Sequence, residues 1–225
     1  MLNMAFVLHT RPYRETSLLV ELLTYEEGRV SVIANGAKRL KSPLKSCLQM
    51  FAPLSVEYTG RHDLQTLKIA EPLKSAYTLQ GKALFCGFYI NELIIHLLHR
   101  HEAHTEIFEL YEHTLHELSR QQDLEPALRS FEIQLLEFLG YAVNLTHDAQ
   151  TQRPIAADKY YYWVQHLGLC ETESGDSRYL GKHLLNMANQ IFTDTQTCQT
   201  AKFLMREVIE HLLGNKTIKS RELFR

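Results

Sequence analysis

The stretch that decides the fold is GRVSVIANGAKRLKSPLKSCLQMFAPLSV, residues 28–56. Its first part, Arg29 to Ala34, alternates with the period of two that is typical of a half-buried β-strand. A basic loop follows, Leu44 to Leu48 could supply a short helix, and a second apolar run starts at Phe51. The stretch therefore predicts two strands joined by a connection that contains a short helix.

Comparable short runs lie on both sides of this stretch and end at turn signals or at proline. The expected strands are Ala5–Leu8, Leu18–Leu23, Arg29–Ala34, Phe51–Tyr58 and Leu64–Ala70. Five short strands without a long helix predict a small closed or partly closed barrel, and the oligonucleotide-binding (OB) type is the best-populated candidate of this size. We expect this barrel to form a first domain over residues 1–76.

From about Thr78 the apolar period becomes helical, and a second domain is expected over residues 77–225. One of its helices is sharply delimited by Asp123 as a cap, Pro126 in the first turn and Gly140 at the end. Residues 142–177 lose the helical period and read as an irregular insert with one strand, Tyr160 to Val164. Helical pattern returns over Tyr179 to Phe192 and Thr197 to Leu213. The fold class expected is α+β, an OB barrel followed by a mostly helical domain.

Positive charge is concentrated in the first domain. The chain carries a net charge of −2, but residues 1–72 sum to +2 and residues 73–225 to −4. Residues 28–56 contain no Asp or Glu, and carboxylates near a phosphate backbone weaken its binding. We therefore predict a nucleic-acid-binding surface, for which the alternative is a solvated loop between strands. The predicted DNA-binding residues are Arg14, Arg29, Lys38, Arg39, Lys41 and Lys45, with Arg61 as an outlier.

Aromatic residues beside the cations could stack on bases. The candidates are Tyr13, Tyr58 and Phe51, although burial in the barrel core is favoured for Phe51. A second basic group, Lys216, Lys219, Arg221 and Arg225, could extend the path of a polyanion or simply solvate its segment.

Motifs for catalysis are missing, since the chain contains no phosphate-binding glycine loop and no nucleophile elbow. The spacing of His96, His99, His101 and His104 gives two i,i+3 pairs on different helix faces, so structural or surface roles are favoured over metal binding. The chain is expected to be no enzyme and to need no cofactor. Whether a metal binds the insert near His147, His166 and Cys170 stays open.

The four cysteines are widely separated, and no secretory leader or long apolar run is present. A cytoplasmic protein with reduced thiols and no membrane contact is expected.

Several blocks of sequence resemble the RecO family of bacterial recombination mediators. They span nearly the whole chain in order, apart from the insert at about 146–176. The blocks are AFVLH (5–9), RPYRETSL (11–18), GRV (28–30), NGAKR (35–39), LQMFAPL (48–54), YINEL (89–93), EPALR (125–129), FE (131–132), LGY (139–141) and KSRELFR (219–225).

The resemblance implies an OB-fold domain joined to a helical domain, and a nucleoid-associated role in repair after DNA damage. It implies binding of single- and double-stranded DNA, annealing of strands coated by single-strand-binding protein, and assistance to RecA loading together with RecR. It places DNA contacts in the basic OB stretch and the docking of the acidic tail of single-strand-binding protein in the helical domain, where Arg129 is the matching candidate. Some members carry a four-cysteine zinc site, but this chain lacks those cysteines.

Two alternatives to an annealing mediator stay open. One is a plain OB-type single-strand binder without a mediator role, and the other is a metal-dependent enzyme that uses the histidine-rich helix. For Arg129, a local ion pair with Glu125 or Glu132 is an equal alternative to binding a partner.

Overall fold

The structure is a computed structural model that describes residues 2–60, 64–121, 123–173 and 179–224. The chain forms two compact units, one built from Met1–Gln122 with Ile218–Arg225 and the other from Asp123–Thr217. The division into two domains at residue 76 stays a prediction, because these units are defined by contacts within the chain and not by domain boundaries. Each unit is described by itself below.

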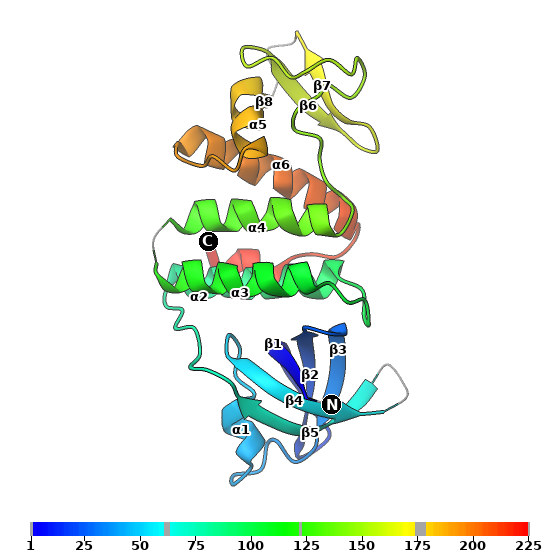
Figure 1. Cartoon of the computed structure of the whole chain (residues 1–225), viewed down its shortest axis with the longest axis vertical. Coiled ribbons are helices and arrows are strands. Elements are labelled where there is room, and N and C mark those ends of the chain that lie inside the picture. The colour runs from blue at the N-terminus through cyan, green and yellow to red at the C-terminus, as the bar shows by residue number, and fades with distance from the viewer. Residues whose placement is uncertain (1, 61–63, 122, 174–178, 225) are drawn as a thin grey trace. The chain divides into compact units, whose positions relative to one another are not determined.

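The first unit contains the expected barrel of five strands (Figure 1). The strands are β1 (Asn3–Tyr13), β2 (Ser17–Thr24), β3 (Gly28–Ala34), β4 (Pro53–Thr59) and β5 (Leu64–Pro72). Antiparallel pairing joins β1 with β2, β2 with β3, β4 with β5, and β1 with β4. Parallel pairing of β3 with β5 closes the barrel in the order β1-β2-β3-β5-β4. The predicted OB-like barrel is confirmed.

Strand β1 is longer than the sequence predicts and continues through Pro12 to Tyr13. The register of β1 with β4 covers Asn3 to Phe6, and Val7 forms an isolated bridge with Met50. Beyond Val7, the described pairing of β1 is with β2. Proline is tolerated on such an edge, where a missing N–H breaks no ladder on the open side. The rule that proline ends a strand therefore fails at this position.

The barrel core consists of side chains that alternate along the strands, as the period-two pattern requires. Fully buried members include Val7, Val20, Val30, Val32 and Leu54. The short helix α1 (Pro43–Cys47) interrupts the chain between β3 and β4, where a short helix was expected. Figure 1 shows α1 beside the end of β5.

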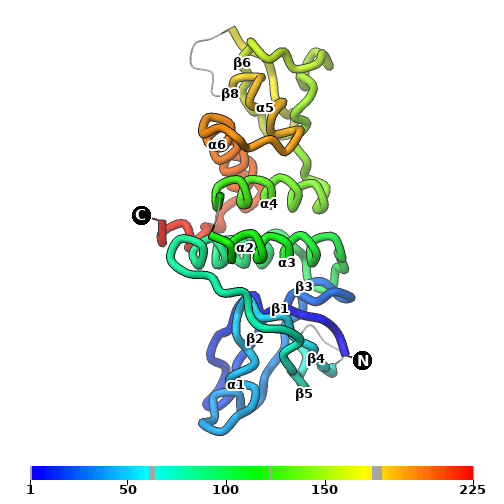
Figure 2. Tube along the Cα trace, turned by 60° about the vertical axis from the view of Figure 1, so that its left-hand side comes forward, coloured from blue at the N-terminus to red at the C-terminus, as the bar shows by residue number. Residues whose placement is uncertain are grey.

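Two helices complete the first unit, α2 (Lys82–Leu97) and α3 (Thr105–Ser119), and they lie side by side (Figure 2). A buried polar chain links them to the barrel. The hydroxyl of Tyr111 on α3 donates to Asn91 Oδ1 on α2 at 2.7 Å, and Asn91 Nδ2 donates to the Leu8 carbonyl of β1 at 2.9 Å. The short 3₁₀ helix η1 (Lys219–Phe224) also packs on α2, where both carboxylate oxygens of Glu92 accept from backbone N–H groups of η1 at 2.8 Å.

The second unit contains α4 (Leu124–Phe138), α5 (Gly181–Ala188) and α6 (Thr195–Leu213). Helix α4 begins and ends where the sequence predicts. Its expected cap is wrong in detail, because Asp123 has a left-handed backbone (φ 50°) and its side chain makes no capping hydrogen bond. Asp194 supplies a true side-chain cap in this unit, since it accepts from the Thr197 N–H of α6 at 2.8 Å.

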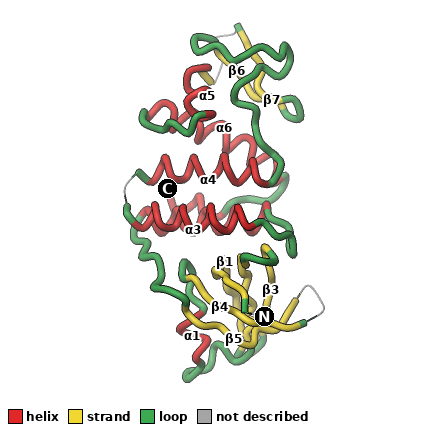
Figure 3. Tube along the Cα trace, viewed as in Figure 1, coloured by secondary structure: helices red, strands yellow, loops and turns green. Residues whose placement is uncertain are grey.

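The insert is more ordered than the sequence suggests, because it forms a three-stranded antiparallel sheet, drawn in yellow in Figure 3. Its strands are β6 (Tyr160–Val164), as predicted, β7 (Gly168–Thr172) and β8 (Tyr179–Leu180). Tyr179 was expected in a helix. It lies instead opposite Tyr161 of β6, and both rings are about 1% exposed in the core of the insert.

A buried carboxylate organises the loop that precedes this sheet. Asp148 is 2% exposed and accepts hydrogen bonds from the backbone N–H groups of Gln150, Thr151 and Glu171 and from the Thr151 hydroxyl, at 2.5 to 3.0 Å. Burial by itself raises the pKa of this carboxyl, but these hydrogen bonds outweigh it and hold the pKa below its ordinary value. The loop is therefore fixed by an ionised side chain.

No helix in the described part of the chain combines the length and the apolar character that a membrane span requires.

Candidate nucleic-acid interface

The basic segment, which we define as residues 35–47, is held on the barrel by its apolar side chains. Ala37 is fully buried, and Leu44 and Cys47 pack partly buried against the barrel core. Backbone hydrogen bonds give the segment a turn-like conformation. The Arg39 N–H donates to the Gly36 carbonyl at 3.0 Å, and the Ser42 N–H donates to the Arg39 carbonyl at 3.1 Å. The apolar side of the segment therefore faces the core, and we call residues 35–47 the ledge from here on.

The cations of this ledge point away from the core, and Lys38, Arg39, Lys41 and Lys45 are all exposed. Within the described ranges, no carboxylate forms an ion pair with any of them. Leu40, in their midst, is 91% exposed and so offers apolar contact beside the cations. Exposed cations that no described acid pairs with are the arrangement that phosphate groups favour.

Arg14 lies close to this ledge, although it is far from it in sequence. It occupies the turn between β1 and β2 with a left-handed backbone (φ 53°), and its guanidinium carbon lies 5.2 Å from the centre of the Tyr13 ring. The Lys38 N–H donates to the carbonyl of Thr16 in the same turn at 2.9 Å. The structure therefore brings Arg14 and Lys38 to one end of the barrel.

Arg29 is differently placed, because its guanidinium is held inside the first unit. Nε donates to the Leu98 carbonyl at 2.9 Å, and Nη1 lies 3.4 Å from Glu21 Oε2. Glu21 is buried and also accepts from Ser31 Oγ at 2.7 Å and from Arg100 at 3.1 Å. Burial is the main cause that lowers the pKa of Arg29. A DNA contact by Arg29 stays a prediction, and its observed contacts join the barrel to the connection after α2.

The three candidate stacking rings have different surroundings. Phe51 is 6% exposed and packs on Phe88 with ring centres 5.8 Å apart, so its expected place in the core is confirmed. Tyr58 is half-buried and donates to Glu27 at 3.0 Å; burial, followed by the Glu27 charge, raises its pKa to about 12. Tyr13, with Arg14 over its face, is half-buried beside the ledge. Tyr13 is thus the ring best placed for a base near the cations.

Arg129 on α4 is 5% exposed, and its Nη1 lies 3.1 Å from Oε2 of the equally buried Glu132. A longer approach, 3.9 Å, joins its Nε to Glu125. The local ion pair considered from the sequence is therefore present. Binding of a partner by Arg129 stays a prediction, and it would require the guanidinium to become accessible.

Metal ligands do not converge in the described residues, where no group of three or more His, Cys, Asp and Glu side chains could hold an ion. In the insert, His166 stacks edge-on against His211 with ring centres 4.9 Å apart, whereas Cys170 is buried and its pKa is raised mainly by that burial. These donors do not fit the four-thiolate zinc site carried by some proteins of the resembled family.

Arg61, the outlying candidate of the first domain, lies outside the described residues. The second basic group is described except for Arg225. Lys216 and Lys219 are exposed. The Arg221 guanidinium carbon lies 5.8 Å from the centre of the Tyr89 ring.

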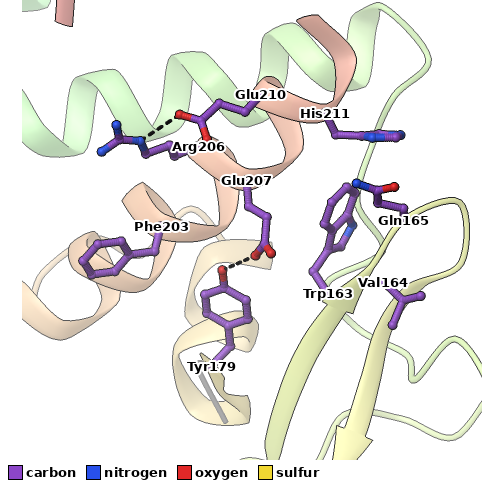
Figure 4. A pocket seen from close by; sticks show the side chains of 9 residues that line it. All are labelled: Trp163, Val164, Gln165, Tyr179, Phe203, Arg206, Glu207, Glu210 and His211. Carbon is purple, nitrogen blue, oxygen red and sulfur yellow. Dashed lines mark hydrogen bonds and ion pairs between the residues drawn. The ribbon is translucent and has the colours of Figure 1, made fainter. Parts of the chain in front are cut away.

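The second unit also contains an open cavity of about 1070 Å³, shown in Figure 4. Its wall on α6 presents Phe203, which is 58% exposed, and an ion pair between Arg206 and Glu210 at 2.9 Å. Opposite, Trp163 faces His211, and the Tyr179 hydroxyl donates to Glu207 at 2.8 Å. Positive and negative charges are mixed here, so this cavity does not favour a polyanion.

Comparison with known proteins places these observations in a family. Residues 1–76 match the family described as Recombination protein O N terminal, and residues 79–222 match Recombination protein O C terminal. The DNA repair protein RecO of Coxiella burnetii (strain CbuG_Q212) is 42% identical over 224 residues, which are 99% of this chain and 96% of that protein. The RecO of Pseudoalteromonas atlantica is 43% identical, over 98% of this chain and 92% of its own length. With an OB-like barrel and matches over nearly its full length, the chain belongs to the RecO family of DNA repair proteins.

Proposed function

We propose that this protein is a non-enzymatic recombination mediator that binds DNA through the ledge and anneals complementary strands coated by single-strand-binding protein. In this proposal it acts on nucleoid DNA in the cytoplasm and, with RecR, assists RecA loading. The observation that carries the proposal is a set of exposed cations on the barrel for which no ion pair occurs among the described residues, in a chain of the RecO family. These cations are Lys38, Arg39, Lys41 and Lys45.

The chemistry of annealing requires no bond to be made or broken by the protein. Two DNA strands repel each other through their phosphates, and cations held on a rigid surface reduce that repulsion while the bases pair. Four phosphate contacts by the ledge predict a log–log salt slope of about −2.8 for single strands. Affinity should then fall about 50-fold between 50 and 200 mM salt.

Docking on the acidic tail of single-strand-binding protein would bring the complex to its substrate. Arg129 is the residue proposed for this contact, and its pairing with Glu132 at 3.1 Å means that a tail carboxylate would have to compete with Glu132. If the wild type binds a fluorescent tail peptide, and Arg129→Gln stays folded but no longer binds it, the contact between Arg129 and the tail is supported. An unchanged affinity would remove Arg129 from the contact.

The test of the central proposal is annealing of complementary oligonucleotides that are first coated with single-strand-binding protein. Wild type is compared with Lys38→Ala/Arg39→Ala/Lys41→Ala, whose salt slope should fall by about 2.1. A matched control, Lys82→Ala/Arg120→Ala/Lys182→Ala, removes the same charge from exposed positions off the ledge.

Annealing lost in the ledge variant and kept in the control supports the proposal. Annealing that survives in both variants moves the DNA site away from the ledge. A wild type that binds bare DNA but never anneals coated strands is instead a plain single-strand binder.

A further inference from the structure

A groove runs between the ledge and β5, within the first unit. Its volume is about 700 Å³. Arg39, Lys41 and Cys47 line it from the ledge and α1, and Lys68, Ile69 and Glu71 line it from β5. Residues separated by some thirty positions in the sequence thus form two facing walls.

Lys68 reaches this groove because of an irregularity in the barrel. Glu57 of β4 pairs with Ile69, but the next residue, Tyr58, pairs with Leu67, so that Lys68 is an extra residue without a partner opposite. Such a β-bulge redirects the side chain of the extra residue, and bulges are frequent at barrel rims beside functional sites. The pairing on either side remains regular, so the bulge is confined to Lys68.

Charge in the groove is predominantly positive, with three cations and one carboxylate among the lining side chains. Lys68 is exposed and, like Arg39 and Lys41, forms no ion pair with any acid of the described chain. Lys74, which follows β5, differs from Lys68 because it is bound to Glu112 at 2.9 Å. Ile69, 39% exposed, adds apolar surface between the charged walls.

We propose that this groove holds a segment of single-stranded DNA, with Lys68 as a phosphate contact opposite Arg39 and Lys41. The inference rests on the proposed function and adds to it a path for the strand and a residue outside the acid-free stretch. Cations on two walls suit one flexible strand, whose phosphates can turn to both sides while a sugar or base lies on Ile69. A rigid duplex presents its phosphates on the outside of a wider rod and would contact only the rims.

The first test uses cysteines that the chain already contains. Cys47 lines the groove, whereas Cys198 lies in the second unit, and both are half-buried. Alkylation by iodoacetamide in the presence of an oligo-dT strand, followed by peptide mass spectrometry, gives the rate at each thiol. Saturating strand should slow modification of Cys47 severalfold and leave Cys198 as the internal control. Equal rates at Cys47 with and without bound strand would overturn the groove as the path.

The second test measures the contribution of Lys68 to binding. Lys68→Ala should reduce the single-strand salt slope by about 0.7, which corresponds to about fourfold weaker binding at 150 mM salt. Lys68→Arg should restore the slope, and Lys82→Ala, an exposed lysine outside the groove, should leave it unchanged.

The outcomes separate the two proposals. If Lys38→Ala/Arg39→Ala/Lys41→Ala weakens DNA binding as predicted and Lys68→Ala binds like the wild type, the groove is refuted and the ledge remains the proposed DNA site. An equal loss of duplex and single-strand affinity in Lys68→Ala refutes the preference for single strands. Absence of any DNA binding by the wild type removes the proposed function itself.

Discussion

Replacing Asp148 by asparagine should destabilise the second unit more than neutralising any other acid in the described part of the insert. The substitution removes the charge from a carboxylate that accepts four hydrogen bonds. One amide oxygen can still accept from Gln150 and Thr151, but the NH₂ group then faces the Glu171 N–H, donor against donor. One lost and three weakened bonds to a buried acceptor amount to about 3 kcal/mol of unfolding free energy.

The assay is urea unfolding of the full chain followed by the fluorescence of Trp163. This residue is the only tryptophan and lies on β6, so its signal reports on the sheet that Asp148 supports. With an m value of about 1.5 kcal/mol/M, the midpoint should fall by roughly 2 M. Asp158→Asn, at an exposed acid in the same segment, is the control, and it should change the free energy of unfolding by less than about 0.5 kcal/mol.

The pH dependence of this variant gives a second readout. The folded pKa of Asp148 is depressed, so its ionised form stabilises the native state at every pH above the unfolded value of about 3.9. That contribution is lost as the pH falls through the lower folded pKa. The difference between wild type and Asp148→Asn should therefore be full at pH 7 and shrink below pH 4. A difference that stays constant with pH, or a midpoint equal to that of Asp158→Asn, refutes the reasoning.

Three further predictions concern the first unit. Arg29→Met should lower thermal stability by about 3 kcal/mol because it leaves Glu21 buried with fewer partners; a loss of salt slope without a loss of stability would contradict this structural role. Tyr111→Phe should cost about 1 to 3 kcal/mol in chemical denaturation, since Asn91 Oδ1 loses its donor, and an unchanged midpoint would argue against the bond. Glu92→Gln should speed hydrogen exchange of the Lys219 and Ser220 amides in η1, because Glu92 accepts hydrogen bonds from both of them. Equal exchange rates would show that η1 is held by other contacts.

The barrel could be predicted because its information is local. Short apolar runs and the turn signals after them define β2 to β5 within a few residues, and the basic loop marks the connection between β3 and β4. Its closure by the parallel pair β3–β5 depends on long-range packing that no local pattern specifies, so the OB assignment rested on strand number and spacing.

Features that depend on distant partners could not be predicted. Tyr179 reads as helical by its apolar period, but pairing with Tyr161 draws it into a strand. The bulge at Lys68 arises from a register shift between β4 and β5, which leaves no mark in the sequence. Glu21 and Arg100 are 79 residues apart, so the network around Arg29 is visible only in the folded chain. For the same reason, four ledge cations were identified by the absence of acids around them, but Lys68 was not.

The course of the chain between the two units affects how the protein can fold during synthesis. The first unit requires residues 218–224, which a ribosome adds only after it has made the whole of the second unit. Until then Glu92 lacks the two amides of η1, and the face of α2 that η1 covers stays open to solvent. A nascent chain therefore holds an incomplete first unit while the second unit is synthesised.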